Sequence, residues 1–105
     1  MAFGMSLGTH KTSLFTETNP LSNLIQTKVC FHSTLIVVFD SEKITLDNGG
    51  WYTPTTKKRM NQASSDFSLG FKVYQKNYEW YCEYQGKIHS FTQNKLVLDR
   101  VGFNR

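Results

Sequence analysis

The chain has 105 residues, which is enough for one ordinary domain and too few for two sizeable cores. Hydrophobic residues make up 39% and aromatic residues 14%, so a compact core needs no metal or disulfide, and collagen, a long coiled coil and full-length disorder are excluded. Twelve Lys and Arg against eight Asp and Glu give a net charge of +4, and no apolar run approaches the ~20 residues of a membrane-spanning helix.

Residues 1–28 are predicted to be an irregular N-terminal arm, and residues 29–105 a single α+β domain. The arm is rich in Ser, Thr, Asn and Gly and has no sustained helical or strand period. It also lacks the apolar core of a secretion signal, so we expect a cytoplasmic protein. Cys30 and Cys82 are then interpreted as buried, reduced thiols.

The first predicted elements of the domain are two strands joined by a short polar turn. Residues 35–39 are apolar and rich in β-branched side chains, which is typical of a central strand. Residues 43–47 alternate polar and apolar with period two, as a half-buried strand does. The short connection between the two segments predicts a hairpin.

A helix is predicted next, over about residues 55–66. Thr53 is a fair N-cap, and Pro54 suits the first helical position because it lacks only an N–H that would be unpaired there. Met60 and Ala63 recur at helical spacing and predict the buried stripe.

Short alternating segments between residues 71 and 99 complete the predicted fold. The coarse order is β-β-α-β-β-β, an α+β fold in which an antiparallel sheet of about five strands packs on one short helix. The sheet is expected either as an open layer or as a partly closed barrel.

Two stretches of the chain resemble a known domain. Residues 49–62 read GGWYTPTTKKRMNQ, and residues 69–76 read LGFKVYQK, followed by Trp80 and Tyr81. They are similar to an uncharacterised small domain of phage and bacterial proteins, over roughly residues 33–100. The resemblance implies a protein of a phage, of a mobile element or of its host in a cytoplasmic setting, and an N-terminal arm peculiar to this chain. It implies no catalytic or binding residues.

Enzyme signatures are absent from the sequence, so we expect no catalysis, metal or cofactor. Asn48-Gly49-Gly50 lacks the spacing of a phosphate-binding loop, and there is no nucleophile elbow. Cys30, His32 and His89 do not form a familiar metal-ligand set, and a Cys82–His89 nucleophile pair has little else to support it. Ordinary sheet positions explain these side chains better.

The strongest functional signal is a set of basic and aromatic residues. Three cations fall in the first turns of the predicted helix, where they oppose the helix dipole and where a bound phosphate would offset them. Lys and Tyr residues share one face of two later strands. Such a surface is typical of proteins that bind single-stranded or structured nucleic acid, in which cations neutralise phosphates and tyrosines stack bases. The predicted nucleic-acid-binding residues are Lys57, Lys58, Arg59, Lys72, Tyr74, Lys76 and Tyr81.

A protein–protein interaction module, either an inhibitor of a host system or an assembly component, is the alternative. The net charge of +4 is modest, and Glu79 and Glu83 dilute the basic sheet face. In this interpretation the arm orders on a host or phage protein, and Trp51 and Tyr52 supply aromatic anchors. The sequence leaves both interpretations open, along with the oligomeric state.

Overall fold

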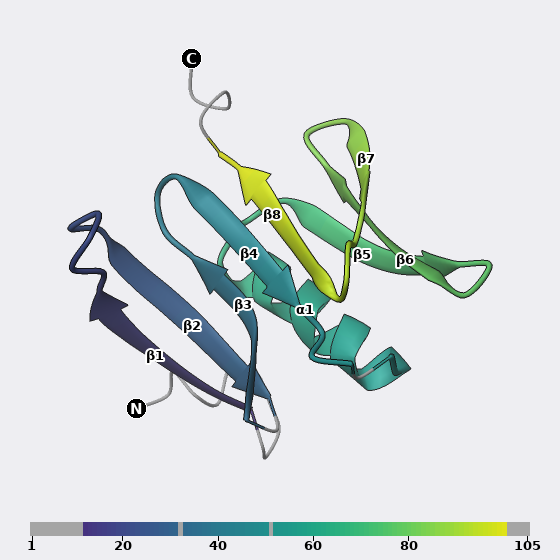
Figure 1. Cartoon of the computed structure of the whole chain (residues 1–105), viewed down its shortest axis with the longest axis horizontal. Coiled ribbons are helices and arrows are strands. Elements are labelled where there is room, and N and C mark those ends of the chain that lie inside the picture. Colours follow the sequence, from purple (N-terminus) through teal and green to yellow (C-terminus); the bar gives the residue numbers. More distant parts are fainter. Residues whose placement is uncertain (1–11, 32, 51, 101–105) are drawn as a thin grey trace.

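The fold consists of two antiparallel sheets and one helix (Figure 1). The computed structural model describes residues 12–31, 33–50 and 52–100. The strands are β1 (Thr12–Thr18), β2 (Ile25–Phe31), β3 (Thr34–Phe39), β4 (Lys43–Asp47), β5 (Phe71–Lys76), β6 (Glu79–Tyr84), β7 (Lys87–Ser90) and β8 (Lys95–Asp99), and the helix is α1 (Pro54–Asp66).

The larger sheet has the strand order β1-β2-β3-β4-β8, and the smaller has the order β5-β6-β7. The predicted α+β class, with an antiparallel sheet of five strands and one helix, is therefore confirmed. Within the described residues β1 and β8 are the two edges of the larger sheet and do not pair with each other, so no closed barrel forms. The predicted hairpin is β3 and β4, in which Val38 lies opposite Thr45.

The prediction of irregular chain over residues 1–28 is wrong for residues 12–18 and 25–28, which form strands, whereas residues 19–24 are the turn that joins them. β1 pairs with β2 along its whole length, and the half-buried Leu14 lies opposite Val29 of the buried core. On the other face the Lys28 ammonium lies 2.6 Å from a Glu17 carboxylate oxygen. Because β1 is held by pairing and packing rather than by its own composition, its hydroxyl-rich sequence gave little strand signal. Residues 1–11 of the predicted arm lie outside the described residues.

The core lies between α1 and the inner faces of the two sheets. Met60 and Ala63 of α1 are fully buried, as the helical stripe predicted. In Figure 1 α1 lies behind the larger sheet, and it contacts β2, β3 and β5. The helix begins as predicted: Thr53 is the N-cap, and its Oγ1 accepts a hydrogen bond from Thr56 N–H at 3.3 Å. α1 has 13 residues, and no helix in the described part is long and apolar enough to cross a membrane.

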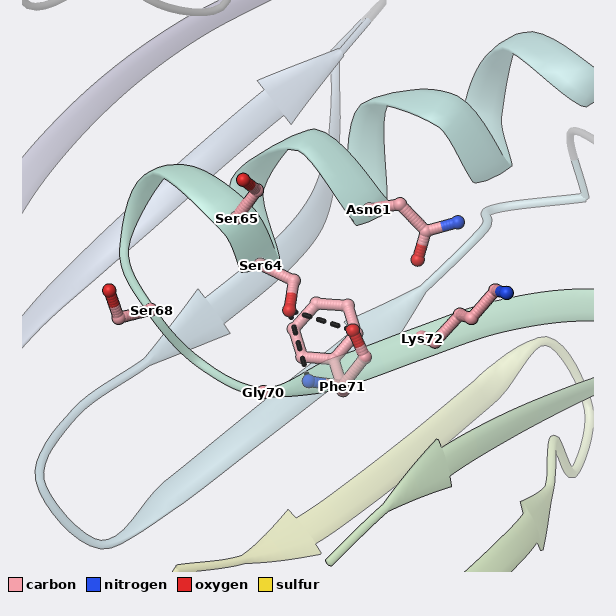
Figure 2. Close-up of a pocket in the computed structure, with 7 residues that line it drawn as sticks. All are labelled: Asn61, Ser64, Ser65, Ser68, Gly70, Phe71 and Lys72. Carbon is pink, nitrogen blue, oxygen red and sulfur yellow. Dashed lines mark hydrogen bonds between the residues drawn. The ribbon is translucent and has the colours of Figure 1, made fainter.

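The contact between α1 and β5 determines where the basic start of the helix lies. The Ser64 hydroxyl donates to the Phe71 carbonyl oxygen at 2.7 Å and accepts from Phe71 N–H at 3.0 Å. Figure 2 shows this side chain between helix and strand. Asn61 makes the equivalent pair of bonds with Val73, two residues further along β5. The helix therefore runs antiparallel to β5 and covers backbone groups at the edge of the smaller sheet.

Candidate nucleic-acid interface

The outward face of β5 carries the predicted lysines, but each lies opposite a glutamate. Lys72 is paired in register with Glu83, and Lys76 is paired with Glu79. All four side chains are exposed. Since opposite charges that face each other across a strand pair attract, this face is close to neutral rather than basic. It offers a polyanion less attraction than the lysines alone suggested.

Tyr74 and Tyr81 lie opposite each other at the centre of that face. Their rings are stacked, with centroids 5.7 Å apart and planes 29° apart. Each ring is half-buried and uses one side on the other tyrosine. The structure therefore brings the two predicted stacking residues together, as a pair whose remaining ring faces are available to a ligand.

The basic start of α1 reaches the smaller sheet from its other side. The Lys57 ammonium donates to Gln75 Oε1 at 2.9 Å and lies 4.8 Å from the centre of the Trp80 ring. Gln75 and Trp80 are opposite each other in register, and Trp80 is buried on the core side of the sheet. Lys57 is thus separated by the sheet from Lys72, Tyr74, Lys76 and Tyr81, and the seven predicted residues form two groups.

Lys58 and Arg59 belong with Lys57 in the first turns of α1. Lys58 is exposed, and Arg59 is half-buried. No acidic residue occupies the first turn of the helix, so no carboxylate next to these charges in the helix offsets them. This segment is the part of the described structure where positive charge gathers without an opposing carboxylate beside it in sequence.

Trp80 also belongs to a cluster of aromatic side chains. The Tyr52 ring packs edge-on against it at 6.0 Å, and the Phe91 ring does the same at 5.6 Å. The Tyr52 hydroxyl donates to Asn94 Oδ1, which ties the chain before α1 to the turn between β7 and β8. Trp51, the other predicted aromatic anchor, lies outside the described residues.

A pocket of about 180 Å³ opens beside this cluster, and we call it the Trp80 pocket. It lies where the β4–α1, β5–β6 and β7–β8 connections meet. No local pattern predicted it, because its walls come from three turns that only the tertiary fold brings together. The sequence signals were Tyr52, the predicted aromatic anchor, and Tyr78 in the turn between β5 and β6. Its principal lining residues are Asn48, Tyr52, Tyr78, Trp80, Phe91 and Asn94.

A larger, open hollow of about 650 Å³ lies along the C-terminal half of α1 and is drawn in Figure 2. Asn61 and Ser64 line it, but both already bond the backbone of β5. Phe71 and Lys72 line its other side. With its best-placed polar groups already paired, this hollow offers a ligand fewer hydrogen bonds than its size suggests.

The family of the chain is decided by a match along nearly its whole length. The family described as Kyanoviridae Gp96 protein matches residues 2–99. The chain belongs to this family. Of the origins that the resemblance implied, which were a phage, a mobile element or its host, the family match supports the first, and the protein is a phage protein. No curated protein and no solved structure matches the chain.

The Kyanoviridae Gp96 match also corrects the predicted status of the N-terminal segment. It begins at residue 2 and so includes β1 and β2. The expectation of an arm peculiar to this chain is therefore wrong.

The Cys82 thiol of this Gp96 family member shows no sign of activation. Cys82 lies opposite His89 in register, but it is fully buried, and burial raises the pKa of its thiol to about 12. Because only the thiolate is a good nucleophile, this pair is poorly suited to attack at neutral pH. Cys30 and Cys82 are both free thiols, but Cys30 is only half-buried, so the expectation of two buried thiols is right for Cys82 alone. Across the described residues no three His, Cys, Asp or Glu side chains gather as a metal site would require.

Proposed function

We propose that this phage protein is a non-catalytic accessory protein that binds single-stranded nucleic acid at the start of α1. The observation that carries the proposal is the position of the Lys57 ammonium, 4.8 Å from the centre of the Trp80 ring. It joins the basic first turns of the helix to an aromatic cluster. Proteins that bind single strands combine these two elements, because cations track the phosphates while aromatic rings stack unpaired bases.

The placement of charges favours the start of α1, rather than the outward face of the smaller sheet, as the surface that binds nucleic acid. Lys57, Lys58 and Arg59 stand together without an acidic neighbour in the helical turn. The lysines of β5 face glutamates instead. The net charge of +4 gives the whole chain a mild attraction for polyanions, and the helix start concentrates it.

Fluorescence anisotropy of a labelled single-stranded oligonucleotide tests this proposal. The variant Lys57→Ala/Lys58→Ala/Arg59→Ala should bind about tenfold more weakly or worse at low salt, because phosphate contacts are lost. The matched control removes three exposed lysines elsewhere, as Lys43→Ala/Lys87→Ala/Lys95→Ala, and changes the net charge equally. Equal weakening in both variants, or no binding by the unaltered protein, would contradict the proposal.

A protein partner is the second candidate, and one observation favours it. Phe15 and Val97 are 44% and 54% exposed on the outer face of the larger sheet. They lie at the two ends of a row of residues that are opposite one another in neighbouring strands, and Lys28, Val38 and Thr45 lie between them. Isolated apolar residues at a surface are common, but apolar side chains along one row of a sheet suit a protein surface. Pull-down from host lysate with the unaltered protein and with Phe15→Ser tests this candidate. A protein that the unaltered chain captures and Phe15→Ser does not would support it, and equal capture by both would contradict it.

A further inference from the structure

We propose that the Trp80 pocket holds one unpaired nucleobase of the bound strand. The inference rests on the proposed function and adds the residues that would contact the base. The pocket lies at the end of the molecule where the Lys57 ammonium reaches Trp80. A strand whose phosphates follow the start of α1 can therefore turn a base into it.

The size of the pocket suits a single ring system. Its volume is about 180 Å³. Pockets for drug-sized ligands start at about 300 Å³. A base fits inside, and the sugar and phosphate of the same nucleotide stay outside, on the side of the basic helix.

Two buried donors in the pocket lack acceptors. Asn48 is fully buried and Trp80 is 4% exposed, and neither Asn48 Nδ2 nor Trp80 Nε1 has a hydrogen-bond partner among the described residues. Asn48 Oδ1 accepts from Gly50 N–H at 2.8 Å, so the amide is oriented with its nitrogen left over. Native proteins seldom leave buried donors unpaired, and such groups call for a partner. The carbonyl oxygens and ring nitrogens of a nucleobase are acceptors of the required kind.

The walls of the pocket favour a flat, aromatic ligand. Tyr52 and Phe91 stand edge-on to Trp80, with interplanar angles of 81° and 76°. At the rim, the Glu79 carboxylate can accept from the N3–H of a thymine. Saccharide sites also combine rings with amides, but the neighbouring Lys57 ammonium favours a ligand that carries phosphate.

Entry of the base requires the rim to move. Both unpaired nitrogen atoms are shielded from solvent in the free protein. Tyr78, at the rim, is 93% exposed and so is hardly held by packing. The Gln93–Asn94 turn is held in place, because the Asn94 carbonyl oxygen accepts from Asn48 N–H at 3.0 Å and Asn94 Oδ1 accepts from the Tyr52 hydroxyl. Displacement of the Tyr78 side chain therefore opens the rim without disturbing this turn or the buried strands.

The test compares an eight-residue thymidine oligonucleotide with an abasic oligonucleotide of the same backbone, read by the Trp80 indole N–H resonance in a ¹H–¹⁵N spectrum. A Trp51→Phe variant assigns the two indole signals. We expect the thymidine strand to shift the Trp80 signal and to bind about tenfold more tightly than the abasic strand, as one stacked base contributes. Asn48→Asp keeps the Oδ1 acceptor but removes the Nδ2 donor. This variant should bind the thymidine strand and the abasic strand with nearly equal affinity. Tyr78→Ser changes an exposed position, so it tests the same point even if Asn48→Asp does not fold. It should reduce the difference in affinity between the thymidine strand and the abasic strand.

Each contrary result has a distinct meaning. Equal binding of both strands with an unmoved Trp80 signal overturns the pocket inference and leaves the proposed function standing. Binding of neither strand overturns both. A Trp80 shift produced by maltotriose, and not by the thymidine strand, identifies a saccharide site and also overturns the inference.

Discussion

The Asn61 side chain makes two hydrogen bonds with the backbone of Val73: its Nδ2 donates to the carbonyl oxygen at 2.9 Å, and its Oδ1 accepts from the N–H at 2.7 Å. Ser64 bonds Phe71 in the same way. The helix thus supplies the backbone N–H and carbonyl groups of β5 with the hydrogen-bond partners that a neighbouring strand would otherwise supply. These bonds fix the rotation of α1, and Lys57, one turn before Asn61, consequently meets Gln75 and Trp80.

Loss of the Asn61 amide should destabilise the fold measurably. Asn61→Ala leaves the Val73 N–H and carbonyl without this partner, and we expect a decrease of about 1–3 kcal/mol in the free energy of unfolding. Urea denaturation followed by circular dichroism measures it. Ser65→Ala, at an exposed position of the same helix, is the control and should change stability by less than about 0.5 kcal/mol. Equal stability of the two variants would show that Asn61 does not hold β5.

Gly49 should tolerate a methyl group less well than Gly86. Both have positive φ, at 59° and 78°, so alanine is strained by about 1–2 kcal/mol at either site. At Gly49 the new Cβ would also lie 2.8 Å from Thr34 Cγ2, whereas Gly86 has open space around it. Gly49→Ala should therefore lower the urea midpoint more than Gly86→Ala. Thr34→Ala should recover part of the difference in a double-mutant cycle, and additive effects would refute the contact.

Stability should fall in alkaline solution because of Cys82. Burial raises the pKa of its thiol from 9.0 to about 12 in the folded protein. Between those values the unfolded chain loses the proton and the folded protein keeps it, so folding becomes less favourable as the pH rises above about 9. Urea midpoints from pH 8 to pH 10 should therefore fall more steeply for the unaltered protein than for Cys82→Val. Parallel slopes would show that the thiol stays protonated on unfolding or is not shielded when folded.

The two groups of lysines should differ in their effect on nucleic-acid affinity. Lys57→Ala/Lys58→Ala and Lys72→Ala/Lys76→Ala remove the same charge, but Lys72 and Lys76 face glutamates. We expect the first pair of substitutions to weaken binding of a single-stranded oligonucleotide by about tenfold and the second by about twofold, as measured by anisotropy at low salt. The reverse order would place the binding surface on the outward face of the smaller sheet.

Local sequence patterns predicted most elements correctly. The alternation in residues 43–47 and 71–76 and the Thr53–Pro54 start signal reflect forces that act within a few residues, and β4, β5 and α1 agree with them. β1 was missed because its strand state depends on pairing with β2, which no local pattern records. The division into two sheets was missed as well, because alternation does not reveal which strands pair.

The candidate site was predicted only in its parts. The alternation of side chains along a strand predicted that Lys72, Tyr74 and Lys76 share one face, and the structure agrees. The alternation within one strand could not show that glutamates of the next strand lie directly opposite these lysines. The contact of Lys57 with Trp80 joins residues 23 positions apart, through a helix whose rotation is fixed by Asn61 and Ser64. Only the packed fold reveals it.

The salt dependence of binding tests the central claim most directly. The affinity for a single-stranded oligonucleotide should be measured from about 50 to 200 mM salt for the unaltered protein, the Lys57→Ala/Lys58→Ala/Arg59→Ala variant and the Lys43→Ala/Lys87→Ala/Lys95→Ala control. Each lost phosphate contact lowers the slope of log affinity against log salt by about 0.7. We predict that the helix variant loses a slope of about 2 and the control variant keeps the original slope. Equal slopes in all three proteins would contradict phosphate binding at the start of α1.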